Sequence, residues 1–115
     1  MNRLPSHWIV SALMRAAYAQ GGQAMLLARG AEERGGILLH CRSVPDGGFL
    51  LELAIDGTDR MFWHRIPQFS EDINDNQALV DAYIARRRAI DDDLWVLELS
   101  AANAHRLAVE SIAVA

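Results

Sequence analysis

The stretch IARRRAIDDDLWVLEL, residues 84–99, sets three arginines against three aspartates and then continues into an apolar segment. Arginines in the last turn of a helix stabilise the negative end of the helix dipole, by roughly 0.3–1 kcal/mol each. Upstream, an apolar stripe at helical spacing contains Arg87 and is formed by Leu79, Val80, Tyr83, Ile84 and Ile90. The pattern therefore predicts a helix over about residues 77–90, followed by a turn and a strand over 94–100.

The same arginines allow a second interpretation. Arg86 and Arg87, joined by an arginine of the sheet such as Arg42 or Arg65, have the side-chain chemistry of an anion clamp. The three adjacent aspartates count against this, because they cancel much of the local positive field. We therefore expect the charge reversal to be mainly structural, with Arg87 burying its stem and keeping its head in solvent.

Glycine-rich turns divide the rest of the chain into short elements. Ser6 is the expected N-cap of a first helix, which is lined with small residues and ends at Gly21-Gly22. Four apolar runs that are typical of strands follow: QAMLLAR (23–29), ILLHCRSV (37–44), FLLELAID (49–56) and DRMFWHRI (59–66). Residues 67–76 are a polar loop in which Asn76 is the expected cap of the second helix. The tail, residues 101–115, fits either a short strand or a frayed helix.

The length of the first hairpin loop decides which residues face one another. A three-residue loop, Pro45–Gly47, sets His40 opposite Glu52 on one face. On the other face it gathers Ile37, Leu39 and Cys41 with Leu51, Leu53 and Ile55. In the next hairpin, a two-residue turn brings Met61 and Trp63 to the His40 face, whereas a three-residue turn brings His64. Both alternatives remain open.

The strands differ in how continuous their apolar runs are. Residues 24–28 and 37–39 are unbroken, and 94–99 is interrupted only by Glu98, which is typical of strands covered on both faces. The third and fourth strands carry charge, and we expect them in the outer part of the sheet. The predicted fold class is α/β, of the α+β kind. It is a single domain over residues 1–115, with a mixed, mostly antiparallel sheet of about five strands and a helix on each face, in the order α-β-β-β-β-α-β.

Composition excludes several functions. With 115 residues, about half of them hydrophobic, the chain can bury a core without disulfides or metal. A net charge of −4 argues against nucleic-acid binding, which usually shows as a basic domain or stripe. Cys41 is the only cysteine, which excludes an internal disulfide and a cysteine-built zinc site. No apolar run approaches a membrane span or a signal peptide, so we expect a cytoplasmic protein without membrane contact.

Three segments resemble a known family. LPSHWIVSALMR (4–15), RGAEERGGILL (29–39) and DAYIARRRAIDDDLWVLEL (81–99) are similar, in this order, to a bacterial family of uncharacterised small proteins, domain of unknown function 1491. Asp92 stands where the family commonly has proline, which costs some rigidity in the turn. The resemblance implies an alpha-beta fold and a cytoplasmic bacterial protein, and it implies no activity.

Two functional hypotheses follow from the residues. The main one is a small binding or interaction module, with a homodimer as one form of it, whose contact surface lies around Arg42, Trp63 and Arg65. Trp8 lies off the apolar stripe of its helix, and an exposed tryptophan there would need covering. The alternative is a small hydrolase-like or anion-binding enzyme in which Glu52 orients His40 as a general base, with His64 or Arg87 joining them. Neither hypothesis requires a metal or another cofactor.

Overall fold

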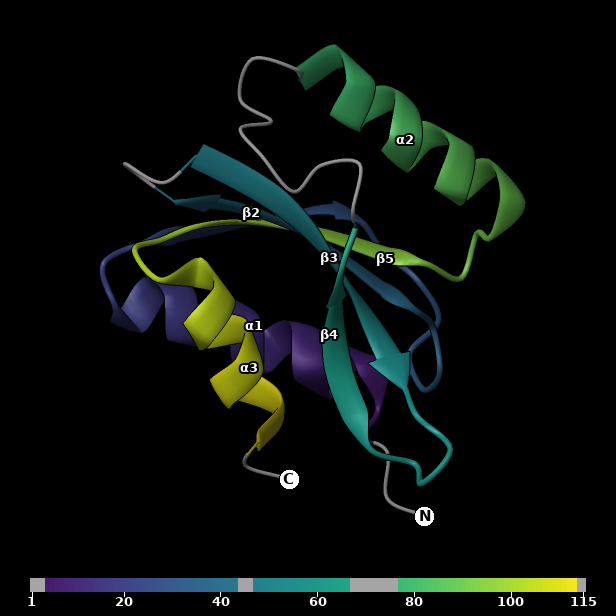
Figure 1. Cartoon of the computed structure of the whole chain (residues 1–115), viewed down its shortest axis with the longest axis horizontal. Helices are drawn as coiled ribbons and strands as arrows, with labels where there is room; N and C mark the ends of the chain where they lie inside the picture. Colours follow the sequence, from purple (N-terminus) through teal and green to yellow (C-terminus); the bar gives the residue numbers. More distant parts are fainter. Residues whose placement is uncertain (1–3, 44–46, 67–76, 114–115) are drawn as a thin grey trace.

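The computed structural model describes residues 4–43, 47–66 and 77–113, and its elements are shown in Figure 1. The helices are α1 (Ser6–Ala19), α2 (Gln77–Ile90) and α3 (Ala104–Ala113). The strands are β1 (Gln23–Ala28), β2 (Ile37–Ser43), β3 (Gly47–Ile55), β4 (Met61–Arg65) and β5 (Trp95–Ser100). The tail after the last strand thus contains a helix. The expected cap Asn76 and most of the expected loop Pro45–Gly47 lie outside the described residues.

The five strands form one mixed sheet in the order β1-β5-β2-β3-β4. β2 and β5 are parallel, whereas the other three neighbouring pairs are antiparallel. The chain leaves the β4 edge, passes through α2 and returns as β5 between β1 and β2. This crossover gives the sheet its single parallel pair, and it confirms the predicted mixed, mostly antiparallel sheet.

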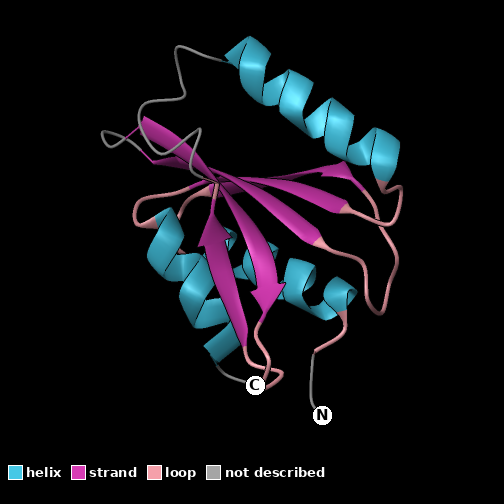
Figure 2. Cartoon of the chain, turned by 45° about the vertical axis from the view of Figure 1, so that its right-hand side comes forward, coloured by secondary structure: helices cyan, strands magenta, loops and turns pink. Residues whose placement is uncertain are grey.

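Helices cover both faces of the sheet, as Figure 2 shows, with α2 on one face and α1 and α3 on the other. The α1/α3 side holds the larger core, which includes Ile9, Leu13, Leu39, Cys41, Leu51, Trp95, Leu97, Leu99 and Leu107. The α2 side holds a smaller core formed by Leu38, Leu50, Ile66, Val80, Leu94 and Val96. The predicted helix on each face is therefore confirmed, with α3 as an additional helix beside α1.

The first hairpin has the predicted faces but not the predicted pairs. His40 lies opposite Leu50, and Glu52 lies opposite Leu38, so the expected His40–Glu52 pair is wrong. The pairs are displaced because Ser43 pairs with Gly47, so Gly47 belongs to β3 and not to the expected loop. A shift of two residues leaves every side chain on its expected face.

The second hairpin brings His64 to the Glu52 face. His64 lies directly opposite Glu52, and Trp63 lies opposite Leu53 on the core face. The connection is longer than expected, because residues 56–60 form a loop in which Asp56 Oδ1 accepts hydrogen bonds from the Thr58 and Arg60 backbone N–H groups. A further hydrogen bond from the Thr58 hydroxyl, together with these two, lowers the pKa of Asp56.

Two local expectations are wrong. β1 was expected to be covered on both faces, but it is an edge strand whose Met25, Leu26 and Leu27 are 60%, 38% and 44% exposed. The prediction failed because an unbroken apolar run does not distinguish an edge strand from a strand with neighbours on both sides. Ser6 is the first residue of α1 rather than its cap, and its hydroxyl donates to the Gly35 carbonyl. Among the described residues, no helix is long and apolar enough to cross a membrane.

Candidate functional site

The charge reversal at the end of α2 is built into a turn. The Arg88 guanidinium donates hydrogen bonds to the carbonyl oxygens of Asp92 and Leu94, at 2.9 and 2.7 Å. Asp91 Oδ1 accepts a hydrogen bond from the Asp93 backbone N–H at 3.0 Å. Asp91, Asp92 and Asp93 cluster closely enough to suggest a cation, but this backbone bond already uses one of their oxygens. These contacts support the structural interpretation of the stretch.

Arg87 ties α2 to the sheet. Its guanidinium donates to both oxygens of the Glu52 carboxylate, at 2.8 and 2.6 Å, and to the Tyr83 hydroxyl at 3.2 Å. The Arg87 and Glu52 side chains are each 27% exposed, and the hydrogen bond with Glu52 raises the pKa of Arg87. Arg86 lies over the Tyr83 ring, 5.8 Å from its centroid. Arg87 thus neutralises Glu52.

The two candidate histidines lie in different environments. His40 is 2% exposed, and its Nε2 has no hydrogen-bond partner among the described residues. Burial lowers the pKa of His40 despite the opposing charge of Glu98, the residue beside it on β5. His64 is exposed on β4. Glu52 is next to His64 but is bound by Arg87, so the expected arrangement of His40 oriented by Glu52 is not formed.

The expected contact surface around Trp63 is also dispersed. Trp63 is 8% exposed beneath α3, where its indole Nε1 donates to the Ala108 carbonyl at 2.9 Å. Arg65 stacks over the Phe49 ring, 4.3 Å from the centroid. Arg42 pairs with Glu98 at 3.1 Å on the α2 side of the sheet. Trp63 is therefore a core residue, and Arg42 and Arg65 contact different groups and do not form one surface with it.

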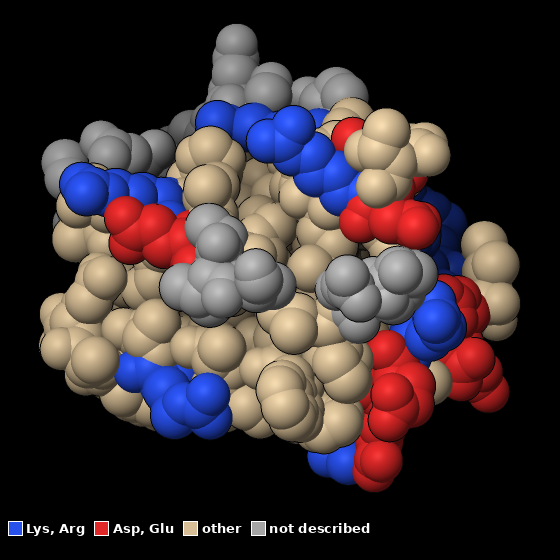
Figure 3. Space-filling view, turned by 90° about the horizontal axis from the view of Figure 1, so that it is seen from below, with Lys and Arg blue, Asp and Glu red and all other residues tan. Residues whose placement is uncertain are grey.

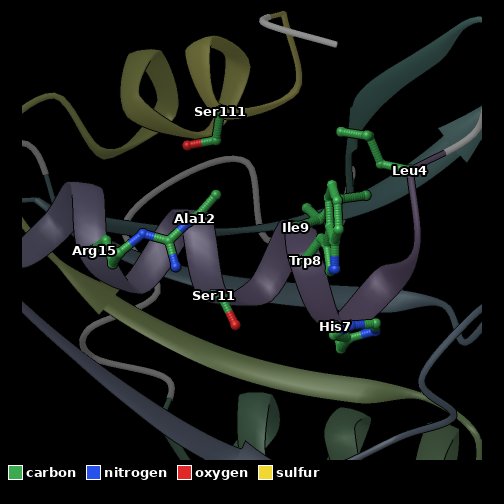
Figure 4. A pocket seen from close by; sticks show the side chains of 8 residues that line it. All are labelled: Leu4, His7, Trp8, Ile9, Ser11, Ala12, Arg15 and Ser111. Carbon is green, nitrogen blue, oxygen red and sulfur yellow. The ribbon is translucent and has the colours of Figure 1, made fainter.

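A groove, the α1/α3 groove, runs beside α1 and includes Ser111 of α3, and Figure 4 shows its lining. Its volume is about 620 Å³, and it is lined by Leu4, His7, Trp8, Ile9, Ser11, Ala12, Arg15 and Ser111. Trp8 and Leu4 lie at one end and Arg15 lies at the other. Trp8 is 60% exposed. Its position off the apolar stripe of the helix was the sequence signal for this site.

The surface on this side of the molecule has an apolar centre and charged margins (Figure 3). Figure 3, which views the molecule from the α1/α3 side, shows a broad uncharged surface with charged side chains gathered at its margins. Within the described part of the chain, Arg15 makes no ion pair or hydrogen bond, whereas the His7 ring is bonded to the Glu32 carbonyl oxygen at 3.0 Å. Arg15 is thus a cation available to a bound group.

Known proteins share this arrangement of elements. A family described as "Protein of unknown function (DUF1491)" matches residues 4–109. The chain belongs to the DUF1491 family. The resemblance seen in the three sequence segments is thereby confirmed. No curated protein matches this chain.

Solved structures share the fold over nearly the whole chain. A crystal structure of a DUF1491 family protein from Caulobacter crescentus is 24% identical, with a TM-score of 0.75, covering 91% of this chain and 94% of that one. An NMR structure of a family member from the same organism is 25% identical, with a TM-score of 0.75 and coverage of 93% and 94%. A solution structure of a protein from A. tumefaciens is 28% identical, with a TM-score of 0.66 and coverage of 92% of each chain.

Proposed function

We propose that this chain is a protein-interaction module that seats a segment of a partner protein in the α1/α3 groove. The observation that carries the proposal is Trp8, which is 60% exposed at one end of the groove while Trp63 and Trp95 are buried. Both buried indoles donate to carbonyl oxygens, Trp63 to Ala108 and Trp95 to Ala31. Tryptophan and arginine are the residue types that most often dominate binding energy at interfaces.

The lining of the groove defines the chemistry of the partner. Leu4 and Ala12 provide apolar walls for a hydrophobic side chain, and Trp8 offers a large flat surface. Arg15 favours a carboxylate at the opposite end, because its guanidinium forms strong bidentate hydrogen bonds with that group. We therefore expect an amphipathic segment that presents an apolar anchor and an acidic residue.

The setting that we propose for this module is the bacterial cytoplasm. A single buried cysteine, Cys41, suits a reducing compartment, and burial raises its pKa and so disfavours the reactive thiolate. The net charge of −4 supports a protein partner rather than a nucleic acid. A homodimer remains part of the proposal, through a surface other than the groove.

The geometry gives less support to the enzyme hypothesis. A general base needs a partner that holds its imidazole in one orientation, and His40 lies opposite Leu50 rather than Glu52. Glu52 directs both carboxylate oxygens to Arg87, so this carboxylate is already engaged by a guanidinium. Neither the α1/α3 groove nor the smaller hollow beside β1 is lined by His40, Glu52 or His64.

Capture from a lysate of the native cell tests the proposed function. Immobilised wild-type protein is compared with Trp8→Ala, Arg15→Gln and the control Ile90→Ala, which alters an exposed apolar residue on α2. We expect one identified protein to be retained by the wild type and by the control, at least tenfold less by Trp8→Ala, and less by Arg15→Gln. That protein should also protect Trp8 from acrylamide quenching. Equal retention by Trp8→Ala and wild type would contradict the proposal.

A further inference from the structure

The two edges of the sheet are built differently. β4 is short, contains His64 and Arg65, and packs against α3. β1 has no charged residue and no proline in its sequence QAMLLA. Proteins usually protect an edge strand with charges, proline, bulges or a covering element, because its unpaired backbone groups otherwise recruit another strand. β1 packs one face against α1, but along its open edge it has only a bulge between Leu26 and Ala28 and the Tyr18 hydroxyl, which donates to the Ala24 carbonyl.

The exposed apolar residues of β1 lie on both faces of the sheet. Met25 pairs with Glu98 on the α2 face, whereas Leu26 pairs with Leu97 on the α1 face. Leu27, within the bulge, is exposed as well. A neighbouring strand would therefore bury apolar surface above and below the sheet while bonding to the open backbone edge. The exposed ring of Tyr18, beside Ala24, would extend that contact onto α1.

We infer that β1 pairs with β1 of a second copy of this chain, antiparallel, to form a continuous ten-stranded sheet. This inference rests on the homodimer of the proposed function and names its surface, which is separate from the α1/α3 groove. A two-fold axis normal to the sheet near Met25 and Leu26 pairs the strand with itself and keeps the α2 face of both copies on one side. Because β1 is uncharged, self-pairing brings no like charges together.

The contrast between the edges also explains why the second copy would close the assembly. A head-to-tail contact of β1 with β4 would continue into an open fibre, but β4 presents arginine and histidine at its edge. Pairing of β1 with itself uses the uncharged edge of each sheet. The result is a closed dimer with a β4 strand at each end.

The mass in solution tests this inference. The chain has a mass of 12.8 kDa, and we expect light scattering on the eluting protein to approach twice that value at high concentration and to fall on dilution. Met25→Lys and Leu27→Lys should each shift the protein to the monomer, because a charge at the pairing edge opposes strand addition. Phe62→Lys alters an apolar position on β4 that is as exposed as Leu27, at 44%, and it should leave the dimer intact. Circular dichroism establishes that each variant is folded.

Thiol cross-linking locates the contact. Because Cys41 is buried, Met25→Cys supplies the reactive thiol, and a short bismaleimide should convert most of this variant to a covalent dimer. Phe62→Cys should cross-link at least fivefold less. A wild type that stays monomeric at every concentration, or equal cross-linking from both positions, would overturn the inference. Either result would leave the proposal of partner binding in the α1/α3 groove intact, because the two surfaces are separate. For the same reason, Trp8→Ala should form dimers to the same extent as the wild type.

Discussion

Arg87 shows how one side chain can serve as both a core residue and an ion-pair partner. Its position within the apolar stripe of α2 directs it at the sheet, and Glu52 on β3 receives it with two hydrogen bonds. The prediction from sequence that its head stays in solvent was only partly right, since the side chain is 27% exposed. The missing information was the position of Glu52, which depends on the sheet register.

Removing this pair should measurably destabilise the fold. Glu52→Gln and Arg87→Gln each leave a partly buried charge without its partner, and we expect each to cost about 1–3 kcal/mol in the free energy of urea unfolding. The double variant should recover part of that cost in a double-mutant cycle. The control is the exposed Arg106–Glu110 pair, which should contribute less than about 0.5 kcal/mol. Equal effects of the two pairs would show that α2 is not held through Arg87.

His40 predicts a pH-dependent stability. Burial lowers its pKa below the ordinary value of 6.5, so the unfolded chain binds a proton more readily than the folded chain. The resulting stability is present above pH 6.5 and is lost as the pH falls through the folded pKa. Glu98, Asp81 and Arg42 are the charged groups that act on His40. We expect the urea concentration at the unfolding midpoint to decrease when the pH is lowered from about 7.5 to about 5.5, a range that spans the ordinary histidine pKa. The decrease should be smaller in His40→Leu. Identical pH profiles for the two proteins would refute this role.

At the level of elements, the turn after α2 depends on two glycines that come from elsewhere in the chain. A Cβ atom at Gly30 or Gly35 would overlap the Asp93 carbonyl oxygen. Ala31 donates its backbone N–H to that same oxygen at 3.0 Å, which docks the loop between β1 and β2 against the turn. The resemblance segments 29–39 and 81–99 are therefore in contact in space. Sequence alone showed their order but not this contact.

This docking gives a prediction with a matched control. Gly30→Ala should destabilise the protein by about 1–3 kcal/mol, because the added methyl group forces the loop away from Asp93. Gly57→Ala should change the stability little, since a methyl group added there would meet no other atom within 4 Å. The midpoint of thermal unfolding measures both. A neutral Gly30→Ala would mean that the loop does not rest on the turn.

The elements differed in how far the sequence could define them. α2 was predicted over residues 77–90, which are its observed bounds, because its apolar stripe and terminal arginines agree. The sequence of the tail fits either a strand or a helix, although Ala104, Leu107, Ala108 and Ser111 follow helical spacing and are buried in α3. The position of β1 could not be predicted, because the crossover that inserts β5 depends on the whole topology.

For the whole molecule, the face of the sheet on which a residue lies was easier to predict than the residue that it pairs with. The apolar pattern requires Leu39 and Leu51 to face the same core, and the registers that satisfy this differ from one another by two residues. His40 and Glu52 therefore share a face as expected without being partners. The groove between α1 and α3 could not be predicted either, since it requires the α3 helix. The candidate site thus depends on the register of the first hairpin and on the position of α3, and neither can be read from the sequence.

The distribution of tryptophans makes the groove measurable in the intact molecule. Trp63 and Trp95 are buried, so Trp8 should provide the fraction of the fluorescence that acrylamide quenches readily. Trp8→Phe should remove that fraction and leave a spectrum shifted to shorter wavelength. Strong quenching that persists in Trp8→Phe would show that Trp63 or Trp95 is accessible, contrary to the packing of α3 and the β1–β2 loop.

The most direct test of the interaction function is photo-crosslinking in the native cell with p-benzoylphenylalanine at position 8. The same amino acid at position 90 is the control, because Ile90 is 85% exposed on α2, outside the groove. We predict a discrete adduct with one other protein from position 8 and none from position 90. The absence of an adduct from position 8, or the same adducts from both positions, would contradict an interaction function for the groove.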